Sequence, residues 1–251
     1  MNTCYNPFSL AGKTVLVTGA SSGIGRATAI ECSKMGAKVI LSARNIERLN
    51  ETLSKLSGEG HTIIEADMTD VEQRKTLAKN TPELDGVVFC AGRGHMALTK
   101  FANIDKFQEI FKINFFSQAE LFRLLLKGKK IKRGTSCVFI VSIGGISVFE
   151  LGNTIYGCSK AALDSYVKFT AKEIGPQGIR INGVLPGMVH TPLIHKGTFT
   201  DEELEKDMQL YPLRRYGEPE EVAYGVIYLL SDAAKWITGS NLMIDGGRSI
   251  F

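Results

Sequence analysis

Short apolar runs rich in β-branched residues recur along this chain, and segments with helical periodicity separate them. Near-continuous apolar runs are typical of strands in a parallel sheet whose two faces are both covered by helices. We therefore predict one α/β domain over residues 1–251, a doubly wound sheet of about seven parallel strands with helices on both faces. The predicted strands are 14–18, 38–43, 61–66, 86–91, 136–142, 179–186 and 241–245. The predicted helices are 24–35, 46–57, 70–80, 104–127, 153–175, 201–210 and 218–231.

Composition and charge exclude several classes of protein. A chain of 251 residues that is 44% hydrophobic can bury the core of one large domain. Its net charge of +4 is far from the dense one-sided charge of a dedicated nucleic-acid binder. No run approaches the ~18 apolar residues of a membrane span, and the first residues do not resemble a signal peptide. We therefore expect a soluble, cytoplasmic protein that binds neither nucleic acid nor a membrane.

Cysteine and histidine spacing predicts no metal site. The five cysteines are odd in number and include no CxxC pair, which is typical of reduced thiols. The four histidines have no HExxH or similar spacing.

Three glycines follow the first predicted strand. The sequence TGASSGIG, residues 18–25, contains Gly19, Gly23 and Gly25. In the first strand-to-helix turn of such a sheet, glycines let the backbone approach a ligand, and the N–H groups at the helix start attract phosphate. A tight turn with close helix packing is the plainer interpretation, but the position after the first strand favours a phosphate-binding turn. The spacing differs from the GxGxxG fingerprint of dinucleotide folds.

The end of the second predicted strand indicates which dinucleotide this turn holds. In such folds an acidic residue there bonds the adenosine ribose and repels a 2′-phosphate. This chain has Ala43 at that position and Arg44 next, and a guanidinium can form a forked pair with a phosphate. Ser42 and Asn45 offer further donors. The alternative is that Arg44 only solvates a loop, but with no acid at this position the sequence favours NADPH.

Tyr156 and Lys160 lie four residues apart in a predicted helix and so share one face. A phenol has a pKa of about 10 and should drop by about three units to exchange protons near neutrality, which an ammonium group about 4 Å away can supply. Such a pair alone is common on solvated helices. Ser142, however, ends the fifth predicted strand, where the carboxyl ends of the sheet form a ligand crevice. The three residues together predict a catalytic site.

Four stretches together resemble the short-chain dehydrogenase/reductase family. They are TGASSGIG at 18–25, YGCSK at 156–160, LPGMVHTP at 185–192 and SDAAKWITGSNLMIDGG at 231–247, so the likeness runs nearly end to end. The resemblance implies a Rossmann-like fold and hydride transfer from a nicotinamide cofactor to a carbonyl group. It implies that Tyr156 protonates the oxygen, Ser142 orients it, and Lys160 also binds the nicotinamide ribose. Asn114, in FKINFFS, matches the family asparagine that holds a water connecting Lys160 to solvent.

The resemblance also implies the NADPH-binding residues. Asp67 matches the residue that bonds the adenine amino group, and Val189 and Thr191 match positions near the nicotinamide carboxamide. Cys90 stands where the family often has an asparagine that braces the sheet, and we expect activity to survive this change. The complete predicted set is Gly19, Ser21, Ser22, Gly23, Ile24, Gly25, Ser42, Arg44, Asn45, Asp67, Met68, Cys90, Ala91, Gly92, Tyr156, Lys160, Pro186, Gly187, Val189 and Thr191.

The substrate and the assembly follow only from a likeness to 3-oxoacyl carrier-protein reductases, the subfamily that this chain looks most like. The basic run KGKKIKR at 127–133 is either a solvated face or a landing patch for an acidic acyl carrier protein. Arg133 matches a basic docking residue of that subfamily, but Gln177 replaces a second one, which leaves the carrier-protein substrate open. The alternatives are an NADP-dependent reductase of a free ketone, sugar or steroid, and a non-catalytic NADP-binding regulator. The family also implies a homotetramer.

Residues 190–215 have the polar composition of a substrate lid. The candidate substrate contacts are His195, Phe199, Met208 and Tyr211, together with His95 on the loop 93–100, although ordinary packing or solvent exposure is the simpler interpretation of each.

Overall fold

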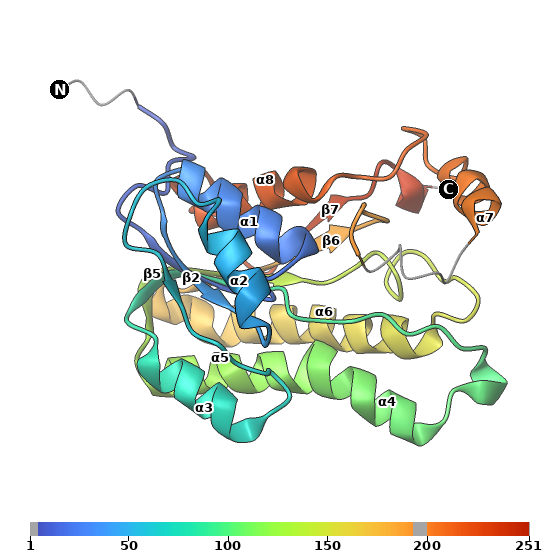
Figure 1. The fold of residues 1–251 in the computed structure, drawn as a ribbon, viewed down its shortest axis with the longest axis horizontal. Helices are drawn as coiled ribbons and strands as arrows, with labels where there is room; N and C mark the ends of the chain where they lie inside the picture. Colours follow the sequence, from blue (N-terminus) through green and yellow to red (C-terminus); the bar gives the residue numbers. More distant parts are fainter. Residues whose placement is uncertain (1–4, 193–199, 251) are drawn as a thin grey trace.

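The computed structural model describes residues 5–192 and 200–250. They contain one parallel sheet of seven strands in the order β3-β2-β1-β4-β5-β6-β7, which confirms the predicted doubly wound α/β architecture (Figure 1). The strands are β1 Thr14–Thr18, β2 Lys38–Ser42, β3 Thr62–Ile63, β4 Leu84–Phe89, β5 Ile131–Ile140, β6 Arg180–Pro186 and β7 Asn241–Ile244.

The strand order reverses between β1 and β4. The chain runs outward from β1 through β2 to β3 and then returns to β4 on the other side of β1. In the register of the sheet, Val15 of β1 lies beside Val39 of β2 and Gly86 of β4. Ligands of doubly wound sheets bind outside the carboxyl ends of the strands at such a reversal. The segments that follow β1, β4 and β5 are therefore the ones that position a site.

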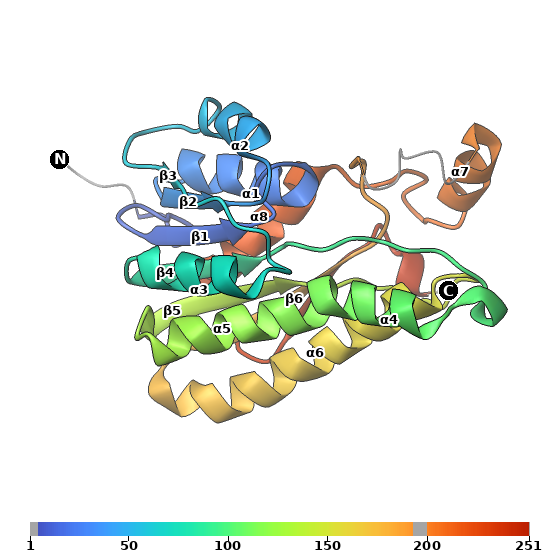
Figure 2. The same ribbon diagram turned by 60° about the horizontal axis from the view of Figure 1, so that its bottom comes forward.

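Helices cover both faces of the sheet (Figures 1 and 2). One face packs against α1, α2 and α8, and the other against α3, α5 and α6. Successive strand residues such as Val138 and Phe139 point to opposite faces and enter separate buried clusters. The helices are α1 Gly23–Lys34, α2 Ile46–Leu53, α3 Val71–Asn80, α4 Ile104–Phe111, α5 Ser117–Lys127, α6 Thr154–Ile174, α7 Asp201–Met208 and α8 Pro219–Leu230.

The helices differ in how the N–H groups of their first turns are satisfied. Asn45, Asp70 and Asn103 precede α2, α3 and α4, and each of these side chains accepts a hydrogen bond from an N–H group in the first turn. Ser22, which precedes α1, makes no such bond, and the first turn of α1 holds no acidic residue. The first N–H groups of α1 therefore lack a side-chain cap and suit an anionic ligand.

The predicted helix 104–127 is not a uniform α-helix. It consists of α4, a π-helical segment at Lys112–Phe116 and α5, without a break. The π segment changes the direction of the following side chains, and it contains the fully buried Asn114. Apolar periodicity does not reveal a local change of hydrogen-bond pattern within a helix, so the sequence predicted one regular element.

The strands β3 and β5 differ most from their predicted bounds. The strand expected at 61–66 is regular only at Thr62–Ile63, because it is an edge strand with a partner on one side. The strand expected at 136–142 begins earlier, at Ile131, next to an irregularity in β4. The basic run 127–133 therefore ends inside β5.

Substitution of Phe139 tests how the core packs between the sheet and the helices α5 and α6. Its ring stacks on Phe89 at 4.2 Å between centroids and meets Phe122 and Tyr166 edge-on. Phe139→Ala should lower the free energy of unfolding by about 3–5 kcal/mol, because it opens a cavity in a fully buried cluster. Urea denaturation measures this loss. Trp236→Ala, at a fully exposed side chain, is the control and should change it by less than about 0.5 kcal/mol; equal losses in both variants would contradict the packing described.

Candidate active site

Lys160 is the charged group at the centre of the candidate site. It lies on α6, one helical turn after Tyr156. The Lys160 ammonium group is buried and donates a hydrogen bond to the carbonyl oxygen of Ile140, the last residue of β5, at 2.7 Å. The same nitrogen lies 5.8 Å from the centre of the Tyr156 ring. The two side chains therefore face each other, as their spacing predicted.

The loop after β5 brings Ser142 to Tyr156. Ser142 is buried and accepts a hydrogen bond from Gly144 N at 3.0 Å, and its hydroxyl is close enough to the Tyr156 phenol to lower the pKa of that group. Close backbone packing fixes this loop on α6. Gly145 has a φ of +85°, and a Cβ atom there would overlap the carbonyl group of Gly157. A larger residue at 145 would push the loop away from the helix and separate Ser142 from Tyr156.

Burial determines the protonation of the pair. Removal from water raises the pKa of the Tyr156 phenol, and the hydrogen bond with Ser142 offsets this only in part. Burial also lowers the pKa of Lys160 to about 8. The expectation that Lys160 depresses the pKa of Tyr156 is not met, because desolvation of the phenol is the largest effect on this pKa and raises it. Tyr156 is held as a neutral phenol.

Asn114 connects this pair to the loop after β4. Its side-chain oxygen accepts a hydrogen bond from Arg93 N at 2.9 Å, and its amide nitrogen donates to Arg93 O and Ser159 Oγ, both at 3.0 Å. A Cβ atom on Gly92 would lie 3.0 Å from Asn114 Oδ1 and 3.7 Å from Lys160 Nζ. These two polar atoms therefore border the same small volume.

The Gly-rich turn forms beside these residues. Gly19 has a φ of +69° and packs on the backbone of Ala91, with its Cβ position 3.0 Å from Ala91 N. A Cβ atom on Gly25 would overlap the carbonyl group of Gly19. From the other side Thr191 reaches the turn, and its methyl carbon is 3.1 Å from the Cβ position of Gly23. The turn after β1, the loop after β4 and the segment after β6 therefore meet in one place.

The residues predicted to select the cofactor lie beyond the end of β2. Arg44 is exposed, and the buried Ser42 hydroxyl has no hydrogen-bond partner among the described residues. Burial raises the pKa of Asp67, but two hydrogen bonds from Thr69 outweigh it, and the nearby Arg44 charge lowers this pKa further. Asn45 caps α2, so its side-chain oxygen is already used. The exposed Arg44 guanidinium is therefore the group in this set that could meet a phosphate of a cofactor, whereas the Ser42 oxygen is buried.

The remaining predicted cofactor residues lie along the same edge of the sheet. The half-buried ones are Ser21, Ser22, Ile24, Cys90 and Gly187, and the buried ones are Met68, Pro186 and Val189. Buried side chains present little surface to a ligand, so the second group shapes the site chiefly through its backbone.

Sequence reasoning missed Thr18, which braces the sheet where Cys90 replaces the family asparagine. The Thr18 hydroxyl donates to Val88 O at 3.2 Å and accepts from Cys90 N at 3.0 Å and Ala91 N at 3.3 Å. It thereby ties the ends of β1 and β4 together. The sequence contained only one indication of this role, namely that Thr18 is the last residue of the first predicted strand.

Two of the candidate substrate contacts are packing residues instead. The Tyr211 hydroxyl accepts a hydrogen bond from Met188 N at 3.1 Å, and its ring lies edge-on to Tyr216. Met208 packs against this pair. The structure therefore favours the packing interpretation of Tyr211 and Met208.

Of the other candidates, the structure describes only His95. His95 is half-buried on the loop after β4, and His195 and Phe199 lie outside the described residues. Within residues 5–192 and 200–250, no cluster of His, Cys, Asp or Glu side chains could hold a metal ion. No helix in these ranges combines the length and the apolar character needed to cross a bilayer.

The basic run 127–133 lies at the opposite end of the sheet from the site. Arg133 is near the start of β5, whereas Ser142 follows its end. At about 3.3 Å per residue along a strand, the two are about 30 Å apart. Gln177 is at the same end as Arg133, since the Cβ position of Gly178 is 2.9 Å from Arg133 Nη1. The run therefore does not border the site of its own chain.

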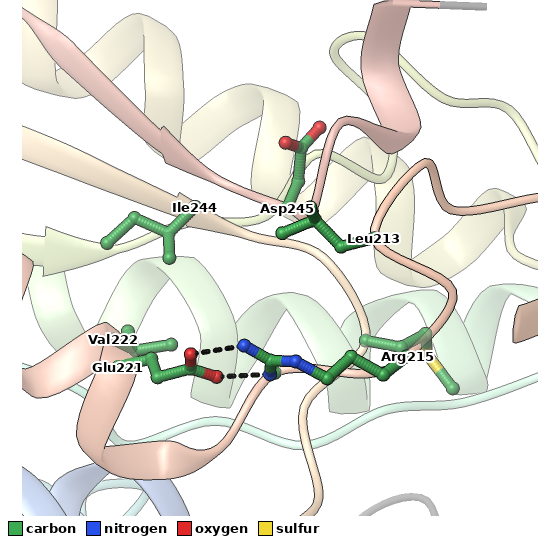
Figure 3. A pocket seen from close by; sticks show the side chains of 9 residues that line it. Leu213, Arg215, Glu221, Val222, Ile244 and Asp245 are labelled. Atoms are coloured by element: carbon green, nitrogen blue, oxygen red, sulfur yellow. Dashed lines mark hydrogen bonds and ion pairs between the residues drawn. The ribbon is translucent and has the colours of Figure 1, made fainter.

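A small cavity of about 90 Å³ lies near β7, α8 and the segment after β6. At its edge Arg215 and Glu221 point toward each other and form two contacts of 2.7 and 2.6 Å, while the carboxylate of Asp245 points away from them (Figure 3). Arg215 and Glu221 are paired with each other, Asp245 accepts hydrogen bonds from Gly247 N and Ser249 N, and none of the predicted catalytic residues lines the cavity. We regard it as packing space beside the site.

The lowered pKa of Lys160 predicts a pH dependence of stability. Between pH 8 and 10.5 the folded lysine is largely neutral while the unfolded one still binds its proton. The unfolded state then binds more protons, so the contribution of Lys160 to the free energy of unfolding rises with pH across this window, by up to about 3 kcal/mol. Urea denaturation of the wild type and Lys160→Met at pH values of about 7 and 10 measures it, because other titrating groups cancel in the difference. A pH-independent difference would show that Lys160 is not desolvated.

Known proteins share both the sequence and the fold of this chain. The family model described as Enoyl-(Acyl carrier protein) reductase matches residues 19–249. The 3-oxoacyl-(acyl-carrier-protein) reductase of Rickettsia prowazekii (strain Madrid E) is 36% identical over 238 residues, which cover 95% of this chain and 97% of that protein. The Pseudomonas aeruginosa RhlG/NADP active-site complex has a TM-score of 0.90 and 30% identity, covering 98% of this chain and 100% of that one.

A further solved structure names the family. It is described as a short chain dehydrogenase/reductase family protein, has a TM-score of 0.87 and 32% identity, and covers 97% of this chain and 100% of that one. These relatives extend over nearly the whole chain, including the Gly-rich turn and the Tyr156–Lys160 helix. The chain therefore belongs to the short-chain dehydrogenase/reductase family of oxidoreductases.

Proposed function

We propose that this protein is an NADPH-dependent reductase that converts a ketone to a secondary alcohol, and that its substrate is a 3-oxoacyl thioester on an acyl carrier protein. The observation that carries the proposal is the meeting of Ser142, Tyr156 and Lys160 at the end of β5, beside the Gly-rich turn. A regulator that only senses a nucleotide needs the turn and Arg44 but not these three buried or half-buried groups. Their arrangement therefore favours an enzyme.

The residues of the chain hold the ketone oxygen and protonate it. Bound NADPH supplies a hydride to the carbonyl carbon. Ser142 donates a hydrogen bond to the oxygen, and Tyr156 transfers the proton that completes the alcohol. Because burial raises the pKa of Tyr156, the phenol carries this proton at neutral pH. The Lys160 ammonium, facing the ring, stabilises the phenolate that remains.

Apolar side chains beside the site favour an acyl chain over a sugar. Met96 and Leu98 on the loop after β4, and Phe149 and Leu151 on the loop after β5, are all exposed, the last two at 78% and 85%. The two loops are hydrogen-bonded to each other, and the second begins with Ser142. A polar substrate would leave this apolar surface in water, whereas an acyl chain would cover it.

Two considerations support an acyl carrier protein as the partner: the name of a relative, and the position of the basic run relative to the site of a neighbouring copy. The Rickettsia prowazekii relative is by its name a 3-oxoacyl-(acyl-carrier-protein) reductase. A carrier docked on the basic run 127–133 would be about 30 Å from the Ser142 of the same chain, so it would serve the site of a neighbouring copy. Phe116 and Phe169, exposed at 57% and 74%, offer apolar surface for such contacts between copies. We propose a homotetramer on this basis and on the family resemblance.

Residues 190–215 remain our proposed substrate lid within a single domain. Its helix α7 is tied to the rest of the chain by the Tyr216 hydroxyl, which donates to Asp207 Oδ2 at 2.8 Å. This contact leaves the lid anchored at its C-terminal side.

Arg44→Ala tests the choice of cofactor. Loss of a charge-assisted contact to the 2′-phosphate, worth roughly 1.5–3 kcal/mol, should raise KM for NADPH about 10- to 100-fold. KM for NADH should stay within about twofold, since NADH has no such phosphate. Steady-state kinetics with both cofactors measures this, with Arg48→Ala, an exposed arginine on α2, as the matched control. Equal changes of KM for NADPH and for NADH would show that Arg44 does not select the cofactor.

Reduction assays test the function itself. With NADPH, the wild type should reduce acetoacetyl thioester on carrier protein with a higher kcat/KM than free sugars or steroid ketones. Tyr156→Phe should bind NADPH with unchanged affinity and lose at least about 100-fold in kcat, because general acid catalysis contributes that much. High salt should weaken turnover of the carrier-bound thioester, since docking through exposed charge is screened. A preference for a free ketone would replace the substrate proposed, and an active Tyr156→Phe would reject the role of the phenol.

A further inference from the structure

Gln118 joins two parts of the candidate site. It lies in the first turn of α5, one turn beyond Asn114, and its side chain is fully buried. Its amide nitrogen donates to Ala91 O at 2.8 Å and to Asn114 O at 2.9 Å. Ala91 belongs to the loop that packs on Gly19 of the Gly-rich turn. One side chain thus connects that loop with the π-helical segment that carries Asn114.

The cost of burying this side chain argues against a purely structural role. Gln118 Oε1 has no hydrogen-bond partner among the described residues. An unpaired buried acceptor costs roughly 1–3 kcal/mol. Leu121, Phe122 and Leu125 of the same helix are buried apolar residues, so a side chain such as methionine would suit the same surroundings. Departures of this kind from simple core packing are expected at functional positions.

A short path leads from Gln118 to the reacting groups. Gly92 follows Ala91, and a Cβ atom there would lie 3.0 Å from Asn114 Oδ1 and 3.7 Å from Lys160 Nζ. Displacement of either Ala91 or Asn114 would therefore change the surroundings of the Lys160 ammonium. Gln118 holds both of them through one amide group.

We propose that Gln118 is a positioning residue for proton transfer. It keeps Asn114 Oδ1 and Lys160 Nζ in place around Gly92 by fixing the backbone of Ala91 and Asn114, and it acts only through these groups. The inference rests on the proposed reductase function. It adds Gln118 to Ser142, Tyr156 and Lys160 as a residue that affects the rate of the reaction.

Gln118→Met tests this role, because methionine has a similar length and removes both the donors and the unpaired acceptor. We expect kcat for ketone reduction to fall about 10- to 100-fold, the loss that follows a displacement of about 1 Å. The Kd for NADPH should stay within about threefold, and Tm should change by no more than a few degrees. The alkaline decline of kcat should also move to lower pH, because displacement of Asn114 Oδ1 leaves the surroundings of the Lys160 ammonium less polar.

Two further variants complete the experiment. Ser117→Ala is the matched control: Ser117 is the buried neighbour of Gln118, and its hydroxyl donates within its own helix to Ile113 O at 2.9 Å. It should keep kcat within about twofold. Gln118→Glu preserves the shape and can donate one hydrogen bond only while its carboxyl group is neutral. Its kcat should therefore fall as pH rises and the acid ionises.

The outcomes separate this proposal from the proposed function. An unchanged kcat and pH profile in Gln118→Met overturns the positioning role, and so does a loss of kcat matched by an equal loss of stability and NADPH binding. If Gln118→Met does not fold, a wild-type pH profile in Gln118→Glu overturns it. If the wild type reduces no ketone, the reductase function itself is rejected and this inference falls with it.

Discussion

The geometry of the site depends on one buried contact, the hydrogen bond from the Lys160 ammonium to Ile140 O. A charged group in the protein interior is unfavourable unless it is hydrogen-bonded, and the lowered pKa of Lys160 reflects this. The contact holds α6 against the carboxyl end of β5, two residues before Ser142. Tyr156 precedes Lys160 by one turn on the same helix face, so the contact also places the phenol beside the serine hydroxyl.

The parts of this arrangement that follow from local spacing could be predicted from the sequence. Apolar runs alternating with helical segments specify a covered parallel sheet, because both faces of each strand must be buried. The four-residue spacing of Tyr156 and Lys160 sets their common face. The need for glycine at positions 19 and 25 could also be predicted, because the backbone segments in this turn approach too closely to leave room for a side chain. Each of these inferences needs only the geometry of one element or one turn.

The parts that depend on contacts between distant segments could not be predicted. The π-helical turn around Asn114 and the bonds of Gln118 to Ala91 arise where α5 packs beside the loop after β4. The pKa of Tyr156 is set by how deeply α6 is covered, so a charge placed by helix spacing gave the wrong direction. The basic run could be seen in the sequence, but its position at the far end of β5 required knowing where that strand begins.

The opposite pKa shifts of Tyr156 and Lys160 bear on the proton-transfer step of the proposed reaction. Burial raises the pKa of the phenol and lowers that of the ammonium to about 8, so one mechanism acts on both groups. A neutral phenol can give up a proton but cannot accept one, whereas oxidation of an alcohol would need the phenolate first. Desolvation thus holds the phenol in the protonated form that the proposed reduction needs, while the equilibrium between ketone and alcohol is independent of the enzyme. In the proposed reaction, burial together with the four-residue spacing prepares Tyr156 to donate the proton.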